Sequence, residues 1–581
     1  MNTRDEIELL INRYALKNAV EHNGKAKSGA ILGKILNERP ELKDNIKNIT
    51  ELVVKVTNDL NKLSFDEQRK TLEERFPEKI SKKKEIKQKV LPLLPNTDKY
   101  PLIVTRFSPN PDCVLHIGSI RALILSHDYA RMYEGKFLLR FEDTDPRLKK
   151  SFLEFYDLIR EDIEWLECKW DAEFIQSDRL PIYYEHVNKL IEIDGAYVCN
   201  CDPLVFKDKL LAGKPCDCRI KSPTEQINRW EEMLEGHYKE GEAVVRVKTI
   251  LNHPNPAVRD WPALRIIDTD KHPHPRVGSK YHIWPLYNFA CGIDDHLLEI
   301  SHIIRGKEHY TNMVRQRYMY DYFKWEYPEA IHYGRLKIPG ATLSKSKIIE
   351  SIREGLVTGF SDPRLATLIA LKRRGIMPET LRKIATEIGP KPVDSQLSWE
   401  NIYATNRKII DKVSNRYFFI SNPILLTVRE VSKKISQSMP KHPDFPERNK
   451  RIFKIAPIKK AIKLIISKND LEIIRGKKLI RLMGLFNILI DEINVDEVIA
   501  TYRGESHIEA RRANSPIIQW VPEDKNVKTE VIMPDMKIFK GLSEQSLEDE
   551  PINNTVQLVR FGFGRIDSME DEVIRIFYTH S

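Results

Sequence analysis

The residues best placed to do chemistry follow a short apolar run. The sequence TRFSPNPDCVLHIGSIRALI at 105–124 predicts a strand ending at Arg106 and Phe107, a proline-rich turn, and a helix opened by His116 and Gly118. A helix N-terminus offers free N–H groups to a phosphate, and glycine allows close approach. A neutral imidazole can donate a hydrogen bond to a phosphate oxygen. The pattern predicts a nucleotide site; the ordinary alternative is a histidine that only caps its helix.

A second candidate is the loop GATLSKSKI at 340–348, which is led by glycine and rich in serine and lysine. Lys345 stands between Ser344 and Ser346. A positioned cation stabilises the charge that develops when a phosphoryl group is attacked. We expect Lys345 to reach the α-phosphate of ATP, although small basic loops are commonly solvated turns.

Four of the seven cysteines form the pattern C-x-C, fourteen residues, C-x-C: Cys199, Cys201, Cys216 and Cys218. Two thiolate pairs on two turns can supply a tetrahedral S₄ site for zinc. The segment around them offers little core of its own, which a structural metal would compensate. A set of reduced thiols without metal is the alternative. Cys113, Cys168 and Cys291 are expected to be small buried residues, with Cys291 also a candidate for lining a substrate pocket.

The elements that must position these residues can be read from periodicity. Strands are expected at 102–107 and 136–143 with a helix at 117–133 between them, which predicts an α/β unit with parallel pairing. Residues 1–98 look helical and polar, and end in the lysine-rich run EKISKKKEIKQKV at 78–90. That run fits either RNA contact or a solvated helix face or linker.

The C-terminal part has a different pattern. From about residue 421 it carries short alternating runs separated by Gly, Pro, Asn and Asp: VIATYRG, SPIIQWVP, VQLVRFGF and VIRIFYTH. This spacing predicts an antiparallel barrel or sandwich.

Together, these motifs resemble the two signatures of class I aminoacyl-tRNA synthetases, HIGH and KMSKS, and most closely the glutamyl/glutaminyl branch in its archaeal-type glutamyl form. The segments that carry the resemblance are RFSPNP, LRFEDTDP at 139–146, YNFACGIDDHLLEISHIIRGKEH at 287–309, YGRLKIPGATLSKSK at 333–347, YRGESHIEARR, IIQWVP and VQLVRFGFGRID. Ser119 replaces the second histidine of the first signature. Thr342 and Leu343 replace the first lysine and methionine of the second, so Lys345 alone would do the phosphate work.

The resemblance implies a set of site residues. His116 and Lys345 would act catalytically on ATP, which would be bound by His116, Gly118, Ser119, Ser344, Lys345 and Ser346. The amino acid would be held by Arg106, Ser108, Glu142, Tyr287, Cys291 and Arg305. Glu142 would pair with the α-ammonium, and the planar fork of Arg305 would select a carboxylate over an amide. A structural salt bridge from Arg305 to Glu308 or Asp295 is the alternative.

The implied fold is α/β and multidomain, with a Rossmann-like core and β-barrels that read the anticodon. The expected parts are a helical extension at 1–98, the first half of the core at 99–195, an acceptor-binding insert at 196–275, the second half at 276–335, the KMSKS-like loop and a helical stem-contact region at 336–420, and barrels at 421–581. ATP, Mg²⁺ and one structural Zn²⁺ are the expected cofactors, with L-glutamate and tRNA-Glu as partners, and also tRNA-Gln if the enzyme is non-discriminating. A glutaminyl enzyme and an inactive RNA-binding paralogue remain alternatives.

The composition is compatible with this assignment. The 581 residues are 41% hydrophobic and 31% charged, with a formal charge of +10, which suits a polyanionic partner without proving one. No apolar run approaches the length of a membrane span, and the charged N-terminus lacks the apolar centre of a signal peptide. The expected location is therefore the cytoplasm, and seven cysteines in so long a chain argue against a disulfide framework.

Overall fold

The computed structural model describes residues 3–21, 24–76, 91–342, 344–477 and 479–581. The chain divides into two compact units, Met1–Val90 and Leu91–Ser581, and each is described here by itself. The lysine-rich run at 78–90 lies outside the described residues. In the part of the chain that is described, no helix is long and apolar enough to cross a membrane.

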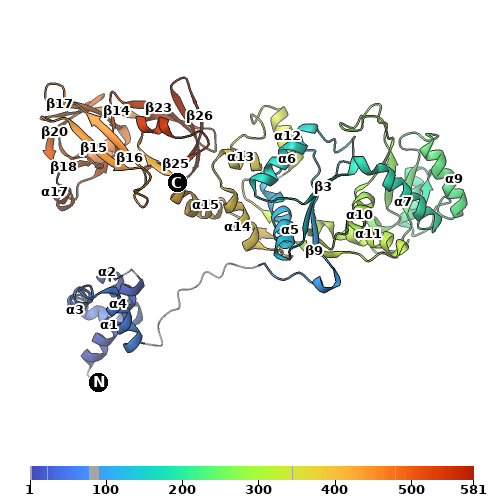
Figure 1. Cartoon of the computed structure of the whole chain (residues 1–581), viewed down its shortest axis with the longest axis horizontal. Coiled ribbons are helices and arrows are strands. Elements are labelled where there is room, and N and C mark those ends of the chain that lie inside the picture. Colours follow the sequence, from blue (N-terminus) through green and yellow to red (C-terminus); the bar gives the residue numbers. More distant parts are fainter. Residues whose placement is uncertain (1–2, 22–23, 77–90, 343, 478) are drawn as a thin grey trace. The chain divides into compact units, whose positions relative to one another are not determined.

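The first unit is a bundle of helices (Figure 1): α1 (Thr3–Glu21), α2 (Ser28–Glu38), α3 (Ile46–Leu60) and α4 (Phe65–Arg75). Its core gathers apolar side chains at helical spacing, among them Ile11, Ile35 and Val53. Ser64 and Glu67 form a reciprocal capping box that fixes the start of α4. The predicted helical character of this region is confirmed for the described residues.

The second unit begins with a parallel sheet. Its strands are β1 (Val104–Phe107), β2 (Lys136–Phe141), β3 (Ala172–Ile175), β8 (His302–Gly306) and β9 (Glu329–Tyr333). β2 pairs in parallel with β1 and β3, and β8 pairs in parallel with β9. The amide of Ser301 donates to the carbonyl of Val104, which sets β8 beside β1. The hydrogen-bonded sheets are β1-β2-β3 and β8-β9, and their arrangement side by side, in the order β3-β2-β1-β8-β9, is that of a doubly wound fold, whose ligands bind at the carboxyl ends of the strands.

Helix α5 (Ile120–Met132) connects β1 to β2 and packs on the sheet through Leu123 and Ile124, which are fully buried. The predicted strand–helix–strand unit is thus confirmed. The helices that flank the rest of the sheet are α6 (Leu153–Trp165), α10 (Tyr287–Leu297) and α11 (Tyr310–Phe323).

An antiparallel sheet of four strands interrupts this core between β3 and β8. It consists of β4 (Ala196–Cys199), β5 (Val244–Val247), β6 (Pro262–Ile266) and β7 (Ile283–Pro285), with α7 (Leu180–Glu192), α8 (Pro203–Leu211) and α9 (Pro223–Leu234). Three buried tryptophans, Trp230, Trp261 and Trp284, fill its core.

A helical segment follows the core and consists of α12 (Lys345–Arg353), α13 (Leu368–Arg373), α14 (Pro378–Ile388) and α15 (Trp399–Val413). The N-terminus of α13 is tied to the first sequence motif by the backbone. The amide of Ile117 donates to the carbonyl of Ala366 at 2.9 Å, and the amide of Leu368 donates to the carbonyl of Leu115 at 3.0 Å. At the other end of α13, Arg373 forms a bidentate ion pair with Asp567.

The C-terminal part forms two seven-stranded sheets with barrel-like topology (Figure 1). The first, in the order β12-β25-β26-β27-β23-β24-β13, comprises Asn415–Tyr417, Thr555–Leu558, Gly562–Glu570, Val573–His580, Asn526–Ile532, Ile538–Glu544 and Phe419–Ser421. The second, in the order β21-β18-β19-β20-β14-β17-β22, comprises Ile517–Ile518, Leu479–Leu482, Asn487–Ile493, Glu497–Gly504, Pro423–Arg429, Ala461–Ser467 and Val521–Pro522.

The all-β character predicted for this part is confirmed, but two of the predicted runs are divided. The run SPIIQWVP is split between β21 and β22, which pair with different strands, β18 and β17. The run VQLVRFGF does not form one strand. It is split between β25 and β26 because Arg560 has φ of 63° and Gly562 has φ of 147°, which turn the chain back on itself.

Candidate active site and metal centre

The first motif lies at the carboxyl end of β1, where His116 precedes a short 3₁₀ turn, Ile117–Ser119, that runs into α5. The amide of Gly118 donates to Nδ1 of His116 at 3.0 Å, so Nε2 carries the proton of the neutral ring. Burial, with a smaller contribution from Lys345, lowers the pKa of His116 to about 4. At neutral pH the ring is therefore an uncharged donor.

The structure brings Lys345 to the loop of the first motif. Its Nζ lies 2.5 Å from Oδ1 of Asp112 and 3.3 Å from the carbonyl of Asn110. Lys345 opens α12, and the Ser344 and Ser346 hydroxyls lie 3.0 Å apart beside it. The two motifs, more than two hundred residues apart in sequence, thus meet through an ion pair.

A cavity of about 160 Å³ opens next to the carboxyl ends of β1, β2 and β8. Five of the six predicted amino-acid-binding residues line it: Arg106, Ser108, Glu142, Tyr287 and Arg305. Its size, about five water molecules, suits an amino acid. The sixth residue, Cys291, is fully buried and does not line the cavity.

A buried network of ion pairs lies next to this cavity. Asp295 accepts from Nε of Arg106 at 3.0 Å and from Nη1 of Arg140 at 2.8 Å. Burial opposes ionisation of Asp295, but the two guanidinium groups outweigh it and hold its pKa well below the usual range. Nη2 of Arg140 also donates to Glu142 at 2.9 Å and to Sγ of Cys291 at 3.3 Å.

Sequence reasoning did not single out Arg140. A signal was present, because Arg140 and Glu142 are two residues apart in the strand expected at 136–143, and that spacing places them on the same side of the sheet; in the structure Glu142 directly follows β2. Tyr287, Cys291 and Asp295 follow one another at intervals of four on α10, which places them on one face of that helix.

Arg305 differs from the other two arginines because it has no acidic partner. Among the residues the structure describes, no Asp or Glu lies within ion-pair distance of it: Asp295 binds Arg106 and Arg140, and the nearest cation to Glu308 is Arg335 at 3.8 Å. The alternative of a structural salt bridge from Arg305 to Glu308 or Asp295 is therefore not observed.

The side chain of Arg305 is only 5% exposed, yet its Nη1 has no hydrogen-bond partner. Its other nitrogens meet neutral groups: Nη2 donates to the Tyr327 hydroxyl at 3.0 Å and to Oε1 of Gln316 at 3.3 Å, and Nε donates to Nε2 of His332 at 3.4 Å. The hydroxyl of Ser108, which also lines the cavity, is likewise buried without a partner. A buried cation in this state retains hydrogen-bonding capacity and charge that an anion could satisfy.

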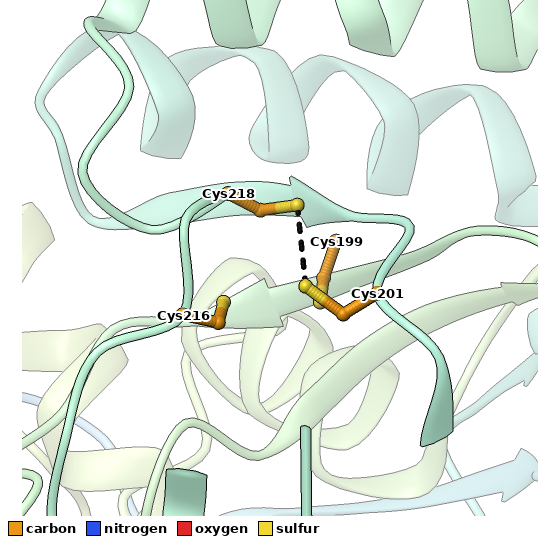
Figure 2. A group of neighbouring side chains, drawn as sticks. All are labelled: Cys199, Cys201, Cys216 and Cys218. Atoms are coloured by element: carbon orange, nitrogen blue, oxygen red, sulfur yellow. Dashed lines mark hydrogen bonds between the residues drawn. The ribbon is translucent and has the colours of Figure 1, made fainter. Parts of the chain in front are cut away.

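The four clustered cysteines converge on one space (Figure 2). Their sulfur atoms all lie within 4.8 Å of one another, and those of Cys201 and Cys218 are 3.6 Å apart. A tetrahedral metal at about 2.3 Å from each sulfur would need sulfurs roughly 3.8 Å apart, so the set fits zinc closely. The apolar cluster around them consists of Tyr197 and Phe206 with the partly buried Leu210 and Val244, which makes a small local core.

Comparison with known proteins agrees with this geometry. The family model for the catalytic domain of class I tRNA synthetases (E and Q) matches residues 102–412, and two models for the anticodon-binding domain of the same family match residues 414–505 and 517–567. The chain belongs to the class I aminoacyl-tRNA synthetases of this glutamyl and glutaminyl branch.

Relatives within the branch are similar over their whole length. A glutamate–tRNA ligase of Pyrococcus furiosus is 48% identical over 99% of this chain and 100% of its own. The glutamate–tRNA ligase of Thermococcus kodakarensis is 47% identical with the same coverage. That of Aeropyrum pernix is 41% identical over 99% of both chains.

Proposed function

We propose that this chain attaches L-glutamate to tRNA-Glu at the expense of ATP. The observation that carries the proposal is Arg305, a buried cation beside the amino-acid cavity that has no acidic partner among the described residues and one nitrogen unbonded. The side-chain carboxylate of glutamate supplies the missing anion. The names of the full-length relatives support the same activity.

Glutamate is oriented by the two ends of the cavity. Its side-chain carboxylate meets the guanidinium of Arg305, with Tyr287 and Ser108 beside it. Its α-ammonium meets Glu142, which Arg140 holds in place at 2.9 Å. Burial raises the pKa of Glu142 although Arg140 opposes the shift, so a bound ammonium group stabilises the carboxylate further.

The first chemical step joins glutamate to ATP, which class I synthetases use with Mg²⁺. An oxygen of the α-carboxylate attacks the α-phosphorus, the bond to the β-phosphate oxygen breaks, and pyrophosphate leaves. Nε2–H of His116 donates to a phosphate oxygen, and the Lys345 ammonium stabilises the developing charge. Lys345 must leave Asp112 to do so, because their ion pair occupies it in this structure.

The second step transfers glutamate to tRNA. The 2′-hydroxyl oxygen of the terminal ribose attacks the carbonyl carbon of the adenylate, the bond from that carbon to the phosphate oxygen breaks, AMP leaves, and the hydroxyl proton passes to solvent. No protein side chain forms a covalent bond in either step. Binding of tRNA falls to the remaining parts: an acceptor-binding insert at 196–275, a stem-contact region at 336–420 and anticodon-reading barrels at 421–581. Phosphate contacts should dominate tRNA affinity and make it salt-dependent.

Discrimination against glutamine follows from Arg305. Glutamine would turn an amide NH₂ toward a guanidinium that can only donate, which leaves buried polar groups unpaired. Rejection of an isostere by such a mismatch reaches about 10⁴-fold.

We also propose that Cys199, Cys201, Cys216 and Cys218 hold a structural zinc ion. The ion would brace the insert where its own core is small, and it has no place in the chemical steps.

The test is aminoacylation by the full-length protein of purified tRNA-Glu and tRNA-Gln, each with labelled glutamate and labelled glutamine. Glutamate on tRNA-Glu is the expected product. Glutamate on both tRNAs would add a non-discriminating activity, while glutamine on tRNA-Gln, or no product, would refute the assignment.

A further inference from the structure

We infer that Gln316 is a positioning residue that fixes Arg305 while leaving its charge uncompensated, so that the affinity of the cavity for a carboxylate is preserved. The inference rests on the proposed role of Arg305 as the receptor for the glutamate side chain. Gln316 lies on α11, is fully buried and does not line the cavity, so it acts through Arg305.

The orientation of the Gln316 amide is fixed by its partners. Oε1 lies 3.3 Å from Nη2 of Arg305 and 2.7 Å from the hydroxyl of Tyr327, and Nε2 lies 3.3 Å from the carbonyl of Asn288. A guanidinium can only donate and a carbonyl can only accept. The amide oxygen must therefore face Arg305, and the backbone of α10 holds the group there.

The other groups that hold Arg305 are also neutral at pH 7. Burial raises the pKa of Tyr327 to about 12, and burial together with Arg305 lowers the pKa of His332 to about 4. Three uncharged acceptors thus bind Nε and Nη2, while Nη1 has none. The guanidinium is fixed through Nε and Nη2, and its positive charge is not neutralised, so Nη1 can bind an anionic ligand.

A glutamate at position 316 has the same shape as the glutamine and keeps an acceptor facing Arg305 and Tyr327, although its second oxygen cannot donate to the carbonyl of Asn288. Its carboxylate would pair with Arg305 inside the protein, and an incoming substrate carboxylate would meet a neutralised cation with a second anion close by. The like charges oppose each other strongly in a buried site. A neutral amide is thus the acceptor that anchors the arginine without competing with the substrate.

The experiment compares Gln316→Glu with Gln316→Met, in the full-length protein, by steady-state charging of tRNA-Glu. Gln316→Met adds no charge and removes the acceptor of Arg305 together with the bonds to Tyr327 and Asn288. Losing the one hydrogen bond to Arg305 should raise KM for glutamate by about 5- to 10-fold. Gln316→Glu keeps the acceptor and adds the charge, and should raise KM by about 100-fold or more. We expect kcat at saturating glutamate to change much less than KM in both variants.

A second readout is the preference for glutamate over glutamine, measured as the ratio of their kcat/KM values. General damage to the site lowers both values together and leaves the ratio alone, whereas neutralising Arg305 lowers the glutamate value selectively. Gln316→Glu should therefore reduce the ratio, and Gln316→Met should largely keep it. A Gln316→Glu variant whose KM and ratio match those of Gln316→Met would overturn the inference.

Failure of the two proposals can be told apart. A wild-type protein that does not charge tRNA with glutamate contradicts the proposed function. An active wild type with an unaffected Gln316→Glu variant contradicts only the role of Gln316. If Gln316→Glu does not fold, as judged by circular dichroism, Gln316→Met and Tyr327→Phe each still remove an acceptor from Nη2 of Arg305. Glutamate KM values within twofold of wild type for both would equally overturn it.

Discussion

Replacing Arg305 with methionine should separate activity from stability. The guanidinium is buried without an acid, so the folded protein carries its desolvation cost before any substrate binds. Methionine has a similar reach and no charge. We expect the variant to lose glutamate charging while keeping or improving its resistance to heat.

The loss of activity can be sized from the geometry. A carboxylate about 4 Å from the guanidinium, at an effective dielectric constant of about 20, gains about 4 kcal/mol, which corresponds to about 1000-fold in kcat/KM.

The effect on stability is smaller because few bonds are stranded. Gln316 and Tyr327 still bond to each other at 2.7 Å, and only Nε2 of His332 loses a partner. The desolvation cost of the ion and the hydrogen bonds it makes to neutral groups are each several kcal/mol and nearly cancel. We expect a change within about 2 kcal/mol.

Arg140→Met is the matched control. Arg140 is equally buried but pairs with Asp295 and Glu142, so its removal strands Glu142, leaves Asp295 with Arg106 alone, and should cost about 3–5 kcal/mol. Tm and tRNA charging with labelled glutamate would be measured for both variants. The reasoning fails if Arg305→Met charges glutamate with wild-type kcat/KM, or if it melts as early as Arg140→Met.

Three further predictions concern the metal, the loop lysine and the histidine. Cys218→Ser should reduce bound zinc from about one equivalent to near zero and expose the 200–222 segment to protease, measured by elemental analysis and limited proteolysis; full zinc retention would count against the site. Lys345→Met should lower kcat about 10²- to 10³-fold with little change in glutamate KM. A rise in glutamate KM as large as the fall in kcat would contradict a role confined to the phosphates. The pKa of His116, lowered to about 4 from 6.5, means that its neutral ring contributes stability fully above pH 6.5 and that this contribution is lost as pH falls toward 4. ATP KM should therefore be flat between about pH 6 and 8, and His116→Asn should weaken the loss of Tm below pH 6.5.

Much of the site could be predicted because local sequence determines it. The 105–124 segment contains its own strand, turn and helix start, so the sequence places His116 at a helix N-terminus without tertiary information. The cysteines follow the same logic, since two short C-x-C turns need only be brought together. The all-β tail was recognisable from alternation, although the turn at Arg560 interrupts one run that looked continuous.

The groups that hold Arg305 could not be predicted in this way. Gln316, Tyr327 and His332 come from α11, the loop after it and β9, and none has a spacing that links it to Arg305 in sequence. Single polar residues in half-apolar segments resemble surface positions until the fold buries them. The absence of an acidic partner for a buried arginine can be recognised only when the positions of all its neighbours are known.

The short helix α13 has a mechanical consequence. At one end, backbone hydrogen bonds join it to the residues around His116. At the other end, Arg373 forms a bidentate ion pair with Asp567 on β26 of a C-terminal barrel. A six-residue helix is too short to bend, so it acts as a rigid connection between these two contacts. A shift of the barrel at Asp567 would arrive at the imidazole as a displacement and would not dissipate in a flexible loop. Removing the ion pair between Arg373 and Asp567 would therefore leave both the barrel and the His116 segment folded, but their positions relative to each other would no longer be fixed.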